Sequence, residues 1–348
     1  MRALVLFLLL GACAAPRGVL VPVSLGFDTD VRPVYTAALR ADENGSFLNA
    51  RSETLQFQRL DITIPKNRDV GDVTFPTNRA DPTKDMLLAG RETFATDQAY
   101  FNATDRAGGE TMLFIHGFNN NYAEGVLRAA QMVEDFQFDG AAAHFSWASA
   151  ASARGYAFDS DSATQARDAL EQVLRGLLAR DDVIVIAHSM GARLFMEVLR
   201  QMAIAGDGHL MENLSGVILM SPDIDVDVFR AQAQRIGALP EPFVIFTSGR
   251  DKALRISAAV RGLRQRLGNL DTLDPVADFN VNLVDFSEIP GGDRLGHFTA
   301  ATSPDAIRII RGVSDRRFSQ GRPAGFPDNV VWEQKGKATR VILRPPGS

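Results

Sequence analysis

From Thr111 onward, short apolar runs alternate with longer stretches in which apolar residues recur every three or four positions. This alternation is typical of strands and helices that follow one another in βαβ units around a parallel sheet. The runs expected to form strands are TMLFIHGF, AAAHFSW, DVIVIAHS, SGVILMSPD, PFVIFTSGRD and FNVNLVDFSE. The pattern therefore predicts an α/β protein with a mostly parallel central sheet flanked by helices.

Two of the stretches between these strands have a clear helical period. Apolar residues between Ala166 and Leu178 recur at i, i+3, i+4 and i+7, so one face of that helix is expected to pack on the sheet. The run ARLFMEVLRQMAIAG has the same period and ends at a Gly-Asp-Gly helix stop. Only about twenty residues separate SPD from the next strand, which is room for a single helix, so no separate lid domain is expected.

The two ends of the chain are less regular. Within residues 17–110, the apolar runs VLVPV, LQFQRLDITIP and QAYFNAT resemble strands separated by turn-forming clusters of Asn, Asp, Gly and Pro. Beyond residue 317 the chain contains Pro, Gly and one short apolar stretch, ATRVILR. That segment is expected to be an extension over the surface or a late edge strand.

Net charge and the absence of known motifs exclude several classes of protein. The formal net charge is -5, and no cluster of Lys and Arg suggests contact with nucleic acid or an anionic membrane. The sequence contains no HExxH, CxxC or GxxxxGK[ST] string, and the first helix of the regular region does not follow a GxGxxG. We therefore expect neither a metal nor a cofactor.

The amino-terminal stretch MRALVLFLLLGACAAP has the pattern of an export signal. Arg2 precedes an apolar run from Ala3 to Leu10, which is too short to span a bilayer. Its ending, LGAC, resembles the bacterial lipobox, whose Cys becomes the acylated first residue of the mature protein; Cys13 is the only Cys in the chain. An ordinary cleaved signal is the alternative. The expectation is a lipid anchor at Cys13 in the cell envelope, with Ala14 favouring the periplasmic side of the outer membrane.

The candidate nucleophile is Ser189. Ala187-His188-Ser189-Met190-Gly191 is a G-x-S-x-G elbow with Ala at the first position, preceded by an apolar strand and followed by an amphipathic helix. The elbow needs small residues two before and two after the Ser, because larger side chains would collide in so sharp a turn. A Ser that merely caps the helix would not need them.

A serine nucleophile needs a base, which is sought here among five histidines. Around such an elbow the expected order along the chain is Ser, acid, His. Only His297, in GGDRLGHFTA beyond the last predicted strand, fits that order; an exposed loop histidine is the alternative reading. Of the other four, His116 follows the first predicted strand and His144 lies inside a strand. His188 is next to the nucleophile, and His209 lies in a polar loop.

Two aspartates compete for the role of acid. Asp251 follows a predicted strand in the loop SGRDKAL, from which a carboxylate can reach a His on the following loop. Asp223, in LMSPDIDVDVF, ends the preceding strand, and Asp225 is a weaker rival. We favour Asp251 because a Ser-Pro-Asp sequence that opens a helix already has a structural use as a turn and an N-terminal charge.

Acyl transfer also needs donors for the oxyanion. One backbone N–H is expected from Met190, the residue after the nucleophile. The second is expected from Phe118 in FIHGFNNN, where Gly117 lets the backbone come close to a substrate. Trp147, at the end of its strand, is either part of the pocket or, as is more usual for such an aromatic residue, part of the core.

Several segments together resemble a bacterial family of α/β-hydrolase proteins, a domain-of-unknown-function group placed with esterases and lipases. The segments are HGFNNNYAEGVLRAAQ, HFSWASAASARGYAFDSDSATQARDALEQVL, VIVIAHSMGARLFMEVLRQ, VILMSPDIDVDVFRAQ and FTSGRDKAL, and the resemblance extends over residues 31–315. It implies an α/β-hydrolase fold, a triad of Ser189, an Asp and His297, hydrolase activity and no cofactor. It supplies no substrate, and Ala187 departs from the usual Gly.

The sequence therefore predicts a serine hydrolase that cleaves an ester, a thioester or an amide of a small-molecule acyl substrate through an acyl-enzyme. An envelope acyltransferase using the same serine and a non-catalytic lipoprotein using the scaffold for binding are the alternatives. The expected division of the chain is a signal peptide and lipobox, a linker, an α/β-hydrolase domain and a carboxyl-terminal extension, over residues 1–13, 14–30, 31–317 and 318–348.

Overall fold

The computed structural model describes most of the chain between residues 18 and 344. The described residues are 18–24, 30–43, 46–76, 79–260, 262, 265–289, 302–303, 307 and 330–344. The predicted signal peptide with Cys13, and the predicted base His297, lie outside them.

The described strands form one 11-stranded sheet in the order β10-β11-β9-β8-β7-β6-β4-β5-β1-β2-β3. Neighbouring strands are parallel throughout the part of the sheet that runs from β11 to β1 in this order. The pairs at the two ends of the sheet, β10–β11, β1–β2 and β2–β3, are antiparallel. The strands are β1 (Asp30–Glu43), β2 (Ser46–Ile64), β3 (Leu88–Phe94), β4 (Glu110–Ile115), β5 (Gly140–Trp147), β6 (Val183–His188), β7 (Leu214–Met220), β8 (Phe243–Thr247), β9 (Asn282–Asp285), β10 (Val330–Lys335) and β11 (Ala338–Leu343).

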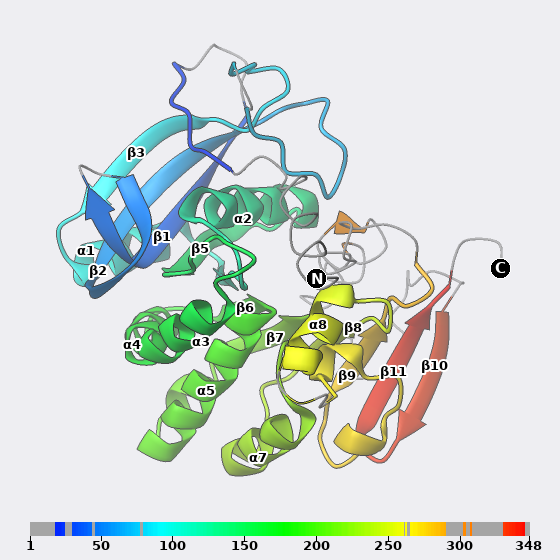
Figure 1. Ribbon diagram of the computed structural model, residues 1–348. Helices are drawn as coiled ribbons and strands as arrows, with labels where there is room; N and C mark the ends of the chain where they lie inside the picture. Colours follow the sequence, from blue (N-terminus) through cyan, green and yellow to red (C-terminus); the bar gives the residue numbers. More distant parts are fainter. Residues whose placement is uncertain are drawn as a thin grey trace, which may run out of the picture.

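Helices cover both faces of this sheet (Figure 1). In Figure 1, α2 lies on the side of β1–β3, and α3, α4, α5 and α7 lie together on the other side. The helices are α1 (Asp97–Ala107), α2 (Tyr122–Phe136), α3 (Tyr156–Gln165), α4 (Arg167–Leu178), α5 (Met190–Ala205), α6 (Gly208–Met211), α7 (Val226–Ile236) and α8 (Lys252–Val260), with short 3-10 turns at Leu267–Asn269 and Asp274–Val276.

Each face of the sheet has its own hydrophobic core. Residues along β6 alternate between the two cores: Val183 and Val185 pack with α4 and α5, whereas Ile184 and Ile186 pack with α2. A strand buried on both faces needs apolar side chains at every position, which is why these strands read as continuous apolar runs. The α/β architecture predicted from the sequence, with a mostly parallel sheet flanked by helices, is confirmed.

The predicted helical stripes are found as expected. Leu170, Val173, Leu174, Leu177 and Leu178 are the buried face of α4. In α5 the buried face includes Leu194, Phe195, Val198, Leu199 and Met202, and the helix ends at Gly206 in the left-handed conformation. One helix, α7, connects β7 to β8, as the short connection after SPD predicts.

The predicted strand QAYFNAT is wrong, because these residues lie in α1. Thr96 caps the helix by accepting a hydrogen bond from the Ala99 N–H, and the chain leaves the helix at Gly108. Tyr100 and Phe101 then point into the core from one helical face. A short apolar run fits either period, so the helix cap is the better guide here.

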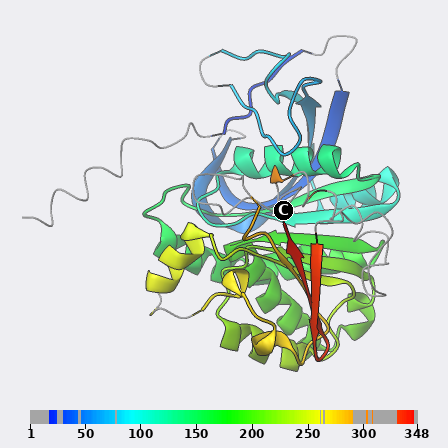
Figure 2. The same ribbon diagram turned by 90° about the vertical axis from the view of Figure 1, so that its right-hand side faces the viewer.

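The ends of the described chain extend the sheet. All of LQFQRLDITIP except its final Pro65 lies within β2, whereas VLVPV forms only one isolated bridge, between Pro22 and Leu88. ATRVILR contains β11, which pairs with β9 on one side and with the edge strand β10 on the other. Figures 1 and 2 show β10 and β11, in red, at the opposite end of the molecule from β1 and β2, in blue.

Within the described part of the chain, no helix combines the length and apolar character needed to cross a membrane. Those same residues contain no group of three or more His, Cys, Asp and Glu side chains arranged to hold a metal ion.

His144 is an ionisable group in the core, between β5 and α2. Its Nδ1 lies 3.2 Å from the Phe114 carbonyl oxygen, its ring stacks on Phe114, and its Nε2 faces Gly125 of α2. Within the described part of the chain, the Nε2 has no hydrogen-bond partner. Burial lowers the pKa of His144 from 6.5 to about 3.

This histidine should make the fold acid-sensitive. The unfolded chain takes up a proton as the pH falls through 6.5, while the folded chain keeps His144 neutral until pH is about 3. Between pH 7 and pH 5 the free energy of unfolding should therefore fall by on the order of 2 kcal/mol from this group alone. Urea unfolding at both pH values should show this loss reduced in His144→Leu; an equal loss in the variant would contradict the assignment.

Candidate active site

The candidate site lies where parallel strands β6, β7 and β8 end side by side. Ser189 follows β6, Asp223 lies three residues after β7, and Asp251 lies four residues after β8. The Ser189 N–H donates to the Met220 carbonyl at 2.9 Å, and the Asp223 N–H donates to the Ser189 carbonyl at 3.2 Å. The carboxyl edge of a parallel sheet is where ligands bind in open α/β folds, so the fold presents these side chains at the expected edge.

Ser189 has the strained backbone of a nucleophile elbow. Its φ is 53° and its ψ is -115°, a region that a residue with a side chain rarely adopts and that costs about 1–3 kcal/mol. The side chain makes no capping hydrogen bond to α5. The interpretation of Ser189 as a simple helix cap is therefore wrong. Since α5 begins at Met190, the positive end of its dipole also lies at this serine.

Two glycines let the backbone close up around the serine. A Cβ at Gly191 would lie 2.3 Å from the His116 carbonyl oxygen and 2.7 Å from that of Ile115, so the first turn of α5 rests directly on the end of β4. A Cβ at Gly117 would lie 2.9 Å from the Ser189 Cβ. The HGF loop therefore lies against the candidate nucleophile.

The three asparagines of HGFNNN hold this loop in place, a role that the sequence did not indicate. The Asn119 N–H donates to the buried Asp159 carboxylate at 3.1 Å. The Asn120 N–H donates to the Ser149 hydroxyl at 3.1 Å, and its amide donates to the Phe118 carbonyl at 2.9 Å. Asn121 forms a capping box with Glu124 at the start of α2. Each residue after Phe118 is therefore tied down.

Trp147 belongs to the core behind the loop and not to a pocket wall. It is fully buried, its Nε1 donates to the His116 carbonyl at 2.9 Å, and its ring stacks on the His116 imidazole with centroids 4.8 Å apart. Burial and the charge of Arg40 keep the pKa of His116 well below its ordinary value. His116 is thus a neutral group beneath the loop.

Asp223 is held by a closed set of partners. Tyr156 and Ser257 each donate a hydroxyl to its carboxylate at 2.6 Å, and the Nε of the buried Arg266 lies 3.3 Å from it. Tyr156 also packs edge-on against Phe118. The predicted helix-opening role belongs to Asp225 instead, which caps α7 by accepting from the Asp227 N–H. Asp223 therefore links α3 and α8 to the strand end.

Asp251 is fully buried at the start of α8, where its carboxylate accepts a hydrogen bond from the Leu254 N–H at 3.0 Å. This contact is the capping role expected of an Asp at a helix N-terminus. Of the remaining histidines, His188 ends β6 and packs against Gly117, while His209 lies in the short helix α6. His297 lies outside the described residues.

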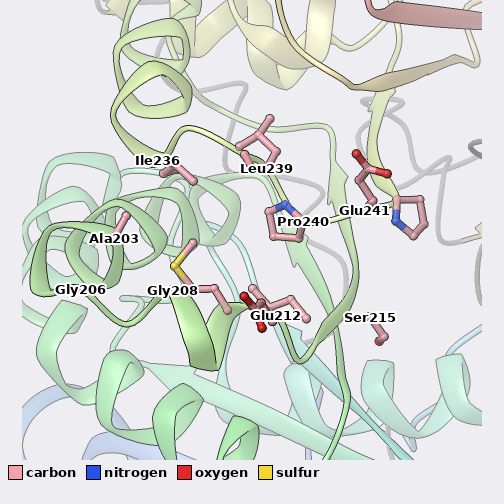
Figure 3. Close-up of a pocket in the computed structure, with 13 residues that line it drawn as sticks. Ala203, Gly206, Gly208, Glu212, Ser215, Ile236, Leu239, Pro240 and Glu241 are labelled. Atoms are coloured by element: carbon pink, nitrogen blue, oxygen red, sulfur yellow. The ribbon is translucent and has the colours of Figure 1, made fainter.

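A pocket of about 860 Å³ lies away from this site (Figure 3). Its lining includes Leu214 and Ser215 at the start of β7, Pro242 just before β8, and Gly206 at the end of α5. These are the amino ends of β7 and β8, whose carboxyl ends lead to Asp223 and Asp251. The pocket therefore has no part in the candidate site.

Gly191→Ala tests the close contact on which the elbow depends. In an ordinary helix, replacing Gly with Ala gains up to about 1 kcal/mol. Here the new methyl would meet two backbone oxygens, and overpacking of this kind costs about 1–3 kcal/mol. Urea unfolding should show a net loss for Gly191→Ala and little change for Gly216→Ala, whose Cβ would find its nearest atoms at 3.6 Å. Equal stability of the two variants would contradict the contact.

Comparisons with known proteins agree with this architecture. A family model described as an alpha/beta hydrolase of unknown function (DUF900) matches residues 94–314. No curated protein matches the chain. Similar solved structures include a CIB-like hydrolase from Thermoplasma acidophilum (12% identity, 82% of this chain and 98% of that chain, TM-score 0.37). Another is esterase B from Lactobacillus rhamnosis (16% identity, 62% and 79%, TM-score 0.37).

An esterase/lipase from an uncultured bacterium is also similar (13% identity, 89% of this chain and 95% of that chain, TM-score 0.33). The family model matches more than half of the chain and includes β4, the elbow and α5. The chain therefore belongs to the family of alpha/beta hydrolases of unknown function.

Proposed function

We propose that this protein is a serine hydrolase that cleaves carboxylic esters through an acyl-enzyme, with Ser189 as nucleophile, His297 as general base and Asp251 as the acid. The observation that carries the proposal is the conformation of Ser189. A strained backbone persists only where the surroundings hold it, and such strain concentrates at functional sites. Here the strain directs a hydroxyl that caps nothing toward the edge of the sheet where ligands bind.

The proposed reaction has two halves. His297 takes the proton of the Ser189 hydroxyl as the oxygen attacks the ester carbonyl, and it returns that proton to the alcohol that leaves. Water then attacks the acyl-Ser189 carbonyl while His297 takes a proton from that water. The same proton returns to Ser189 as the carboxylic acid is released.

The oxyanion of each tetrahedral intermediate would be bound by the Phe118 and Met190 N–H groups. Met190 is the first residue of α5, where N–H groups have no acceptor within the helix. The close approach of Gly117 to Ser189 supports the placement of the neighbouring Phe118 N–H beside the nucleophile. Donors fixed in advance at this position contribute a large part of the rate enhancement in acyl transfer.

The contacts of the two aspartates support Asp251 as the acid. Two hydroxyls and a buried guanidinium already contact the Asp223 carboxylate, which gives this aspartate a structural role of its own. The Asp251 carboxylate accepts from the Leu254 N–H at the start of α8, and Asp251 follows β8, which lies two places from β6 in the sheet.

A fluorophosphonate probe tests the nucleophile. Wild-type protein should be labelled at Ser189, because only an activated serine reacts with such a probe at a useful rate. Ser189→Ala should abolish labelling and hydrolysis of p-nitrophenyl esters, and His297→Ala should reduce hydrolysis by roughly 10³-fold or more. Folding of each variant is checked by circular dichroism. Folded wild type that is neither labelled nor active would favour a non-catalytic role for the scaffold.

Matched Asn variants distinguish the two aspartates. Asp251→Asn keeps an oxygen to cap α8 but cannot hold the imidazolium, so kcat should fall by about 10³–10⁴-fold with little loss of stability. Asp223→Asn should chiefly destabilise the fold, by about 3–5 kcal/mol, since it leaves Arg266 buried without its counter-charge. The remaining folded Asp223→Asn protein should still react with the probe. The reverse result would assign the acid to Asp223.

A further inference from the structure

We infer that Arg40 is a positioning residue that acts through His116 to aim the Phe118 N–H at the oxyanion. This inference rests on the proposed serine hydrolase function. Arg40 lies in β1, outside residues 94–314 that the family model matches.

Arg40 is a fully buried cation with no direct counter-ion. Its side chain has 0% exposure, and it forms no ion pair with a carboxylate in the described part of the chain. The charge that most favours its protonated form belongs to Asp159. Burying a charge without a direct partner is costly, so an apolar residue would suit a strand whose only task is to pack. The cost points to a use for the guanidinium.

The guanidinium joins the end of β5 to the HGFNNN loop. Its Nε donates to the Ser146 hydroxyl at 2.7 Å, and its Nη1 donates to the Ser149 carbonyl at 3.3 Å. Its Nη2 donates to the Asn120 carbonyl at 3.1 Å and lies 3.2 Å from the His116 Nε2. The contact of Nη1 with Asn49 on β2 is longer, at 3.4 Å. One side chain therefore holds both ends of the loop that carries Phe118.

These contacts select one tautomer of His116. Arginine only donates, so an Nε2 that faces it must accept, and the single ring proton then lies on Nδ1. There it donates to the Gly117 carbonyl, 2.9 Å away. In the opposite tautomer the proton on Nε2 would face the N–H groups of Arg40. The unprotonated Nδ1 would then face the Gly117 carbonyl oxygen, which is also an acceptor. This tautomer would gain only the Trp147 carbonyl at 3.1 Å, which already accepts from the Ser149 N–H.

The tautomer of His116 fixes the direction of the Phe118 N–H. The Gly117 carbonyl and the Phe118 N–H belong to one planar trans peptide, and they point in opposite directions. When His116 holds the carbonyl on its own side, the N–H faces away from His116. Gly117 packs closely against Ser189 and His188. The chain of contacts from Arg40 through His116 to Gly117 thus orients a donor toward the nucleophile.

Neighbouring contacts keep the peptide from rotating. Asp159 accepts from the Asn119 N–H and from the Ser149 hydroxyl, and Ser149 in turn accepts from Arg40 through its carbonyl. The positive Arg40 and the negative Asp159 are therefore linked through Ser149 and together neutralise the buried loop. An oxyanion donor that is displaced by as little as 1 Å can cost about 100-fold in rate.

The test compares Arg40→Met and Arg40→Lys with Arg68→Met in the full chain. Arg68 is a matched control: its side chain is 4% exposed, it pairs with the buried Asp135, and among the described residues none of its hydrogen bonds reaches the HGFNNN loop. Each variant is assayed for kcat and KM with a p-nitrophenyl ester. Affinity for an alkyl trifluoromethyl ketone, which binds as a tetrahedral oxyanion, is measured beside them, with values corrected for the folded fraction.

For Arg40→Met, kcat and trifluoromethyl ketone affinity should both fall by about 100-fold, while KM changes by less than about threefold. Arg40→Lys should show a smaller loss, since an ammonium keeps the charge but cannot reach all the partners of the guanidinium. Arg68→Met should lose stability but keep kcat and inhibitor affinity. Arg40 variants that keep kcat, or that behave like Arg68→Met, would overturn the inference.

Nitrogen-15 NMR of the His116 ring gives a readout that does not need activity. Wild type should carry the proton on Nδ1, and Arg40→Met should lose this preference; His116→Gln assigns the resonances. A wild type that is inactive and unlabelled would refute the proposed hydrolase while the tautomer still reports on Arg40. An Nδ1 tautomer that persists in Arg40→Met, or is absent from wild type, would overturn the inference whatever the activity.

Discussion

The contact between the first turn of α5 and the end of β4 is the constraint on which the site depends. Gly191 lies so close to the Ile115 and His116 carbonyls that no side chain fits between them. Because the helix lies this close to the sheet, the chain must pass from β6 to α5 through a single residue. That residue is Ser189, whose backbone is strained. The strain is small beside the burial of Leu194, Phe195 and Leu199 on the same helix, which contributes about 1.5–3 kcal/mol for each side chain.

Charges near the elbow are arranged in pairs that cancel without exposing either member. Arg266 lies against Asp223, and Arg40 lies one serine away from Asp159. Each pair links segments that are far apart in sequence: one joins α3 and α8 to the end of β7, and the other joins β1 to the loop before α2. In a water-poor site, such fixed charges and dipoles act more strongly than they would in solvent. The same arrangement therefore serves both the stability of the loops and the electrostatics of the site.

Much of this arrangement could be predicted from the sequence, because it depends on the spacing of residues that are close together in the chain. The buried strands, the stripes of α4 and α5, and the small residues around Ser189 each follow from spacing alone. The strand predicted for QAYFNAT was wrong because a run of seven residues fits the period of a strand as well as that of a helix. Thr96, the cap that identifies the helix, lies outside the run. The partners of Asp223, and the roles of Asn119 and Arg40, depend on contacts between residues about 30 to 110 positions apart. Such contacts leave no periodic trace, although an Arg within the apolar run of β1 was an available hint.

The pairing of β1 with β5 and of β11 with β9 covers both edges of the parallel part of the sheet around the site. Residues 94–314, which the family model matches, contain β5 and β9 but neither strand that covers them. Those two strands would otherwise present rows of open N–H and C=O groups to any extended peptide, and parallel strands rich in apolar residues are prone to pair edge to edge with other chains. The flanking segments thus act as built-in protection against aggregation, and a fragment trimmed to the matched region would lose it on both sides at once.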